Sequence, residues 1–130
     1  MTGGDVAVLL RHRRPALRLG RWTREAPDRI ACTSHGAGPW RWADLLEGAA
    51  QSAGLLAGLQ PGGPCNTAVI AEYRDVVVHA PAHDGPARFT AALDRRVLGF
   101  WRCRVAVAAA DGRPLLEAIV TVAPERHHGP

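Results

Sequence analysis

The feature that most constrains the fold of this chain is one helical segment near its middle, with strand-like segments on both sides. Residues 42–59 read WADLLEGAAQSAGLLAGL, and apolar residues recur there at the spacing of a helix face. Prolines and glycines follow at 61–64, which predicts that the helix ends near Leu59. A single long apolar helix is stable only when other elements cover it.

The remaining segments supply that cover, because most of them are typical of strands. Asp5 to Leu10 is a short apolar run that predicts a helical turn or two, and Asp111-Gly112 predicts a hairpin turn. Strands are expected at 16–22, 29–33, 67–78, 86–97, 100–109 and 115–122. This order predicts an α+β fold in which an antiparallel sheet of five or six strands curls around one helix, the hot-dog arrangement.

Length and composition indicate one domain. The chain has 130 residues, 47% of them hydrophobic, which is enough for a core that needs neither disulfides nor a structural metal. We expect the domain to span residues 1–124 and the tail, residues 125–130, to be disordered. The three cysteines are far apart and form no Cys-x-x-Cys pair, so we expect reduced thiols.

The terminal and charge patterns predict a cytoplasmic protein that binds neither membrane nor nucleic acid. The apolar runs are shorter than the roughly 20 residues of a membrane-spanning helix, and basic residues follow the first apolar run instead of preceding it. The formal charge is +4, but the arginines are scattered and not interleaved with aromatic residues. A nucleic-acid surface is therefore not expected.

The helical segment carries one polar stripe, formed by Asp44, Glu47, Gln51, Gly54 and Gly58. One interpretation is the solvent face of an amphipathic helix. The other places Glu47 in a pocket as a catalytic carboxyl. The sequence pattern leaves both open.

His35 lies twelve residues before Glu47, between a short strand and a Gly/Pro loop. It is a candidate base, although a plain loop residue fits the same position. No second cysteine pair or suitably spaced carboxylate accompanies the histidines, so no metal site is expected.

Three segments, in order along the chain, resemble the 3-hydroxyacyl-acyl carrier protein dehydratases of fatty acid synthesis. Residues 9–15, LLRHRRP, followed by Leu17 and Leu19, resemble the family's LLPHRxPxLL opening. Residues 45–54, LLEGAAQSAG, are similar to its helix signature EAxAQxxG, and residues 99–103, GFWRC, to its penultimate strand. The resemblance implies a hot-dog fold and dehydratase activity.

The chain also departs from that family on the N-terminal side of the helix. The family's Gly-His-Phe-Pro motif corresponds to Ser34-His35-Gly36-Ala37, two positions closer to the glutamate. Trp42-Ala43-Asp44 replaces the family's Pro-Gly pair, and this helix entry resembles the dehydratase-like proteins of aryl polyene clusters, which lack the histidine. Glu47 is thus the firmer correspondence and His35 the weaker one.

The resemblance implies elimination of water from a 3-hydroxyacyl thioester without a cofactor. Glu47 would donate a proton to the leaving hydroxyl and His35 would take the C2 proton. Backbone amides of Trp42, Ala43 and Asp44 would bind the thioester oxygen at the helix N-terminus, and Gln51 would orient the Glu47 carboxyl.

The implied partners are an acyl carrier protein and a second hot-dog subunit. In the family each site is built from two subunits, so a homodimer or a heterodimer is expected. The cluster of Arg11, Arg13 and Arg14 could meet the acidic carrier protein or the phosphate of its pantetheine arm, with a solvated basic corner as the alternative. Two other functions stay open: a hot-dog acyl thioesterase, and a non-catalytic subunit of a heterodimeric dehydratase.

Overall fold

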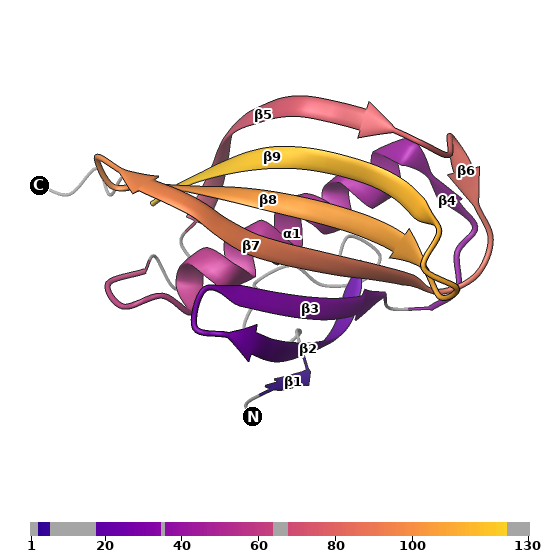
Figure 1. Ribbon diagram of the computed structural model, residues 1–130, viewed down its shortest axis with the longest axis horizontal. Helices are drawn as coiled ribbons and strands as arrows, with labels where there is room; N and C mark the ends of the chain where they lie inside the picture. The colour runs from indigo at the N-terminus through magenta and orange to yellow at the C-terminus, as the bar shows by residue number, and fades with distance from the viewer. Residues whose placement is uncertain (1–2, 6–17, 35, 64–67, 125–130) are drawn as a thin grey trace, which may run out of the picture.

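The computed structural model describes residues 3–5, 18–34, 36–63 and 68–124. One helix, α1 (Trp42–Gly58), lies against one side of a large antiparallel sheet (Figure 1). This confirms the α+β hot-dog prediction. Within the described residues, no helix has the length and apolar character that crossing a membrane requires.

In the described part of the chain, the main sheet has seven strands in the order β1-β2-β3-β7-β8-β9-β5, and every neighbouring pair is antiparallel. Its strands are β1 (Gly3–Asp5), β2 (Leu19–Ala26), β3 (Arg29–Ser34), β5 (Ala68–Val78), β7 (Ala87–Val97), β8 (Phe100–Ala109) and β9 (Pro114–Pro124). β5 follows the helix in sequence but lies at the far edge of the sheet, beside the last strand, β9.

α1 forms where the apolar spacing predicts it. Its N-terminus is stabilised by the Asp44 carboxylate, whose Oδ2 accepts a hydrogen bond from the Arg41 N–H at 2.9 Å. At the other end the Leu59 N–H donates to the carbonyls of Leu55 and Leu56, and Pro61 follows shortly after. The predicted range 42–59 is therefore correct to within one residue.

The core lies between α1 and the concave face of the sheet. Alternate residues of the central strand β8, namely Trp101, Cys103, Val105 and Val107, are buried, while Arg102 and Arg104 between them point outwards. Fully buried leucines of the helix, among them Leu45 and Leu56, pack against this face. A continuous core of this kind needs no disulfide, and Cys32 and Cys103 are buried free thiols.

Glycines are required at two turns of the sheet and at one close contact between the helix and the sheet. The turn between β8 and β9 contains Asp111 and Gly112, as predicted, and Gly112 has a φ of +89°. In the hairpin between β7 and β8 the turn residues are Leu98 and Gly99, both with positive φ. Gly48 on α1 lies under the Phe89 ring of β7, and a Cβ there would come within 2.5 Å of that ring.

Several sequence expectations need correction. The strand expected at 16–22 begins at Leu19 and extends to Ala26. The strand count of five or six is wrong, because β1 adds a seventh strand and Trp40–Arg41 (β4) and Ala82–His83 (β6) form a separate two-stranded sheet. The helical turn expected at Asp5 to Leu10 is not supported at Asp5, which belongs to β1. Residues 6–10 and the tail 125–130 lie outside the described part of the chain.

Candidate active site on the polar face of the helix

Glu47 lies in the second turn of α1, where its side chain is half-buried. Its Oε1 accepts a hydrogen bond from the side-chain amide of Gln51, with a Nε2 to Oε1 distance of 3.3 Å. Glutamate and glutamine four residues apart on a helix are neighbours on its surface, so the helix itself brings these two groups together.

The orientation of the Gln51 amide is fixed by the backbone of another element. Gln51 is 3% exposed, and its Oε1 accepts the Arg18 N–H at 2.8 Å. A backbone N–H can only donate, so the amide oxygen must face Arg18 and the NH₂ group must face Glu47. The predicted orienting role of Gln51 therefore has a specific geometry. At Gln51 the solvent-face interpretation of the stripe is wrong.

Asp44, one turn earlier, belongs to an ion pair. Its Oδ1 lies 3.0 Å from Nη2 of Arg18, and both side chains are about one-third exposed. Arg18 thus contacts the stripe twice, through its N–H at Gln51 and its guanidinium at Asp44. This arrangement ties the start of β2 to the polar side of α1.

The three amides expected to bind an oxyanion are not equivalent. The Trp42 N–H donates to the Pro81 carbonyl at 3.0 Å, so the expectation that it is open is corrected. That bond holds the helix entry against the segment before β6, which no sequence pattern indicates. Ala43 and Asp44 remain the candidate amides in the first helical turn, whose positive dipole end favours an anion.

Sequence reasoning did not single out Tyr73, on β5, a strand that contacts α1. Tyr73 is 41% exposed. Its partial burial and then the negative charge of Glu47 raise the pKa of its phenol. The strand was predicted, but the placement of Tyr73 next to the helix depends on the sheet register. The signal available in the sequence was that Tyr73 is the single tyrosine of the chain.

His35, the predicted base, lies outside the described residues, as do Arg11, Arg13 and Arg14. Its neighbour Ser34 is well fixed, because its hydroxyl donates to the Gly36 carbonyl at 2.7 Å and accepts the Ala87 N–H at 2.9 Å. Across 3–5, 18–34, 36–63 and 68–124, no group of three or more His, Cys, Asp or Glu residues is placed to hold a metal ion.

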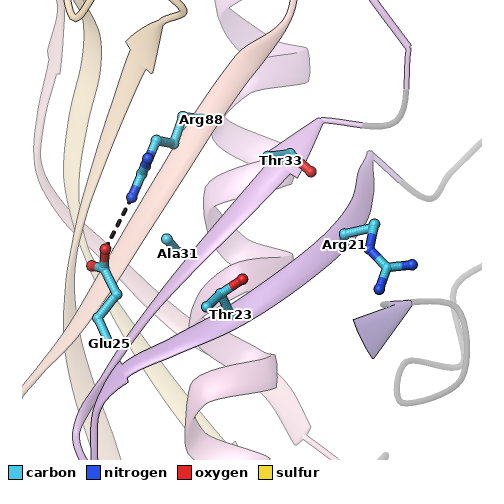
Figure 2. Close-up of a pocket in the computed structure, with 6 residues that line it drawn as sticks. All are labelled: Arg21, Thr23, Glu25, Ala31, Thr33 and Arg88. Atoms are coloured by element: carbon cyan, nitrogen blue, oxygen red, sulfur yellow. Dashed lines mark hydrogen bonds and ion pairs between the residues drawn. The ribbon is translucent and has the colours of Figure 1, made fainter. Parts of the chain in front are cut away.

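A shallow pocket of about 390 Å³ opens on the other side of the sheet. Figure 2 shows that its side chains come from β2, β3 and β7, with an ion pair between Arg88 and Glu25 at 2.9 Å. Trp22 and Cys32 alternate with these residues and are buried in the core. The pocket therefore faces away from Glu47 and is separate from the helix stripe.

Comparison with known structures supports the fold assignment. The chain has the hot-dog fold, and structures with this arrangement include dehydratases and thioesterases. No protein-family model matches the chain, and no curated protein matches it in sequence.

Among the solved structures, the dehydratase heterocomplex ApeI:P from Xenorhabdus doucetiae matches with a TM-score of 0.78 and 15% identity, over 94% of this chain and 91% of that one. AziG from S. sahachiroi matches with a TM-score of 0.64 and 20% identity, over 82% and 90% of the two chains. A thioesterase from Haemophilus influenzae matches with a TM-score of 0.65 and 12% identity, over 82% of this chain and 80% of that one. At these identities the likeness concerns the fold.

Proposed function

We propose that this protein is a dehydratase that eliminates water from a 3-hydroxyacyl thioester carried by an acyl carrier protein, in fatty acid or polyketide/polyene biosynthesis. The observation that carries the proposal is the held carboxyl of Glu47: a half-buried glutamate on the central helix, with one oxygen fixed by the buried amide of Gln51. The likeness to a dehydratase heterocomplex over nearly the whole chain supports it.

Glu47 is the general acid in this mechanism. Because Gln51 donates to Oε1, Oε2 is the oxygen that would carry the proton to be transferred. A base removes the proton at C2, the C2–C3 double bond forms, and the C3–O bond breaks. The departing hydroxyl takes the Glu47 proton and leaves as water. No metal or cofactor takes part.

The charge that grows on the thioester oxygen is stabilised at the start of the helix. The N–H groups of Ala43 and Asp44 lie in its first turn, where the helix dipole favours a negative charge. His35 is the proposed base, because an imidazole is neutral and basic near pH 7.

The functional unit is a dimer, either of two copies of this chain or with a second hot-dog subunit. β5 is an edge strand whose exposed large residues are mostly valines, including Val69, Val77 and Val78. A long edge strand with several exposed valines is a template for pairing with another chain. In such an assembly the base of each site comes from the neighbouring subunit.

A hot-dog acyl thioesterase is the second candidate, since several similar structures are thioesterases. The same Glu47 carboxylate would then activate a water molecule for attack on the thioester carbonyl. The third candidate, a non-catalytic subunit of a heterodimeric dehydratase, is favoured by the likeness to a dehydratase heterocomplex.

Product analysis with a 3-hydroxyacyl-acyl carrier protein separates these functions. The dehydratase yields the enoyl thioester, the thioesterase a free acid and a free thiol, and a non-catalytic subunit neither. Glu47→Gln should lower the dehydration rate by about 100-fold or more, because the amide has no acidic proton. Glu72→Gln is the matched control: Glu72 is half-exposed and paired with Arg74, so its removal should leave the rate unchanged. Full activity in Glu47→Gln would overturn the proposal.

A further inference from the structure

Tyr73 is placed on the face of the sheet that covers the helix. It pairs with Val120 of β9, which in turn pairs with Cys103 of β8. The Cys103 thiol lies 3.9 Å from the Ala53 carbonyl oxygen of α1. Directly paired residues point to the same side of a sheet, so Tyr73 points to the helix side as well.

The strand is irregular on both sides of this residue. The register of β5 against β9 shifts between Ile70 and Glu72, and again between Arg74 and Val77. Asp75, inside the second shift, has a φ of +51°. Such bulges bend a strand and redirect its side chains. Figure 1 shows β5 passing along the edge of the sheet beside α1, which it contacts.

Among the charged groups around Tyr73, Glu47 is the one whose charge raises the pKa of the phenol. Glu72 and Arg74 flank Tyr73 on the strand, point to the opposite face and pair with each other at 3.4 Å. On α1, Asp44 is bound to Arg18. β9 contributes the apolar Val120. The phenol remains protonated at neutral pH, because partial burial and then the Glu47 charge raise its pKa.

We propose that Tyr73 is a positioning residue for Glu47, with its hydroxyl donating a hydrogen bond, directly or through one water molecule, to the Glu47 carboxylate. This inference rests on the proposed dehydratase function and adds a second donor to it. Gln51 donates a hydrogen bond to Oε1 of Glu47, and Tyr73 would donate one to Oε2, the oxygen that carries the transferred proton.

A hydrogen bond from Tyr73 would stabilise the carboxylate that forms when Glu47 gives up its proton. When Glu47 protonates the leaving hydroxyl, its own O–H bond breaks and the electron pair stays on the carboxylate as a new negative charge. A hydrogen bond to an ionised group is about twice as strong as one between neutral groups. The Tyr73 O–H would therefore stabilise Glu47 more after proton transfer than before it, while the phenol keeps its own proton.

The first test is a spectroscopic titration, which requires no substrate. Because Tyr73 is the single tyrosine, the near-ultraviolet absorbance of tyrosinate reports it alone in the full chain, with circular dichroism to verify that the fold persists. In the wild type the midpoint should lie above the ordinary phenol value of about 10. Glu47→Gln should lower it, and Glu72→Gln, adjacent in sequence but on the other face, should not. An equal midpoint in wild type and Glu47→Gln would overturn the proposal.

The second test is kinetic. Tyr73→Phe keeps the ring and removes the hydroxyl, so we expect kcat for dehydration to fall by roughly 10-fold with KM changed by less than about twofold. Unchanged kcat in Tyr73→Phe, together with a large loss in Glu47→Gln, would overturn the role of Tyr73 and leave the proposed function intact. Full activity in Glu47→Gln would instead overturn the proposed function, whereas the titration would still report whether the two groups meet.

Discussion

At the scale of single residues, the site depends on the Gln51 side-chain amide, whose hydrogen bonds are compatible with only one orientation of the amide. Gln51 connects a backbone N–H of the β2 segment to a carboxyl on α1, and it does so while almost completely buried. Gln51→Leu keeps the side-chain volume but removes the amide that binds the Arg18 N–H and the Glu47 carboxyl. Buried polar groups that lose a partner cost about 1–3 kcal/mol each.

We therefore expect Gln51→Leu to lower the free energy of unfolding by about 1–3 kcal/mol, measured by urea denaturation. It should also lower the dehydration rate, because Oε1 of Glu47 would be free to rotate. Gln60→Leu is the comparison, since its amide donates to the Pro27 and Leu56 carbonyls at a half-exposed position. This account would be contradicted if Gln51→Leu lowered the free energy of unfolding no more than Gln60→Leu does.

The buried thiols give a pH-dependent prediction at the same scale. Burial raises the pKa of Cys32 to about 12 and, with the Asp94 charge adding to it, that of Cys103 to about 12. Unfolded thiols ionise near pH 8.5, so the unfolded state loses protons first. The stability due to these groups is present below that pH and is lost as the pH rises towards 12.

The measurable consequence is protection from thiol reagents. In a Cys65→Ser background, neither Cys32 nor Cys103 should react at pH 8 in the folded protein, and both should react in denaturant. Rapid labelling of the folded protein would show that these thiols are not buried as described.

At the scale of elements, two glycines of α1 have different surroundings. A Cβ at Gly48 would meet the Phe89 ring at 2.5 Å, whereas a Cβ at Gly54 would have no atom within 4 Å. Replacing a helix glycine with alanine gains roughly 0.5–1 kcal/mol when space allows, and overpacking costs about 1–3 kcal/mol.

Gly54→Ala should therefore raise the thermal midpoint and Gly48→Ala should lower it, although both lie in the same helix. Calorimetry of the two variants measures the difference directly. Similar midpoints would mean that the ring of Phe89 can move aside and that close packing on Gly48 is unimportant.

The same scale shows where sequence reasoning succeeds. The helix range and the hairpin at Asp111-Gly112 follow from local periodicity and turn chemistry, and Glu47 and Gln51 meet because helix spacing alone brings them together. The bond from Trp42 to Pro81 and the contact between β5 and α1 join segments far apart in sequence. Their positions depend on sheet register and loop path, which local patterns do not encode.

At the scale of the whole molecule, the sheet has two unlike edges. One edge is the three-residue β1, while the other is the eleven-residue β5 with several exposed valines. Natural edge strands are usually short or charged where they must stay unpaired. The length of β5 and its exposed valines therefore predict a dimer in which β5 strands of two chains extend the sheet.

Val77→Lys should disrupt that dimer, because it places a charge on a strand that needs an apolar partner. Val77 is 47% exposed and Val97, in the hairpin between β7 and β8, is 45% exposed, so Val97→Lys introduces the same change away from the edge. Light scattering at micromolar concentration should give twice the 13.9 kDa chain mass for the wild type and Val97→Lys, and the mass of a single chain for Val77→Lys.

A wild-type protein that is a single chain would contradict self-pairing and leave a second hot-dog subunit as the partner of β5. Dehydration should follow the same pattern as the mass, since each site takes its base from the neighbouring subunit in the proposed assembly.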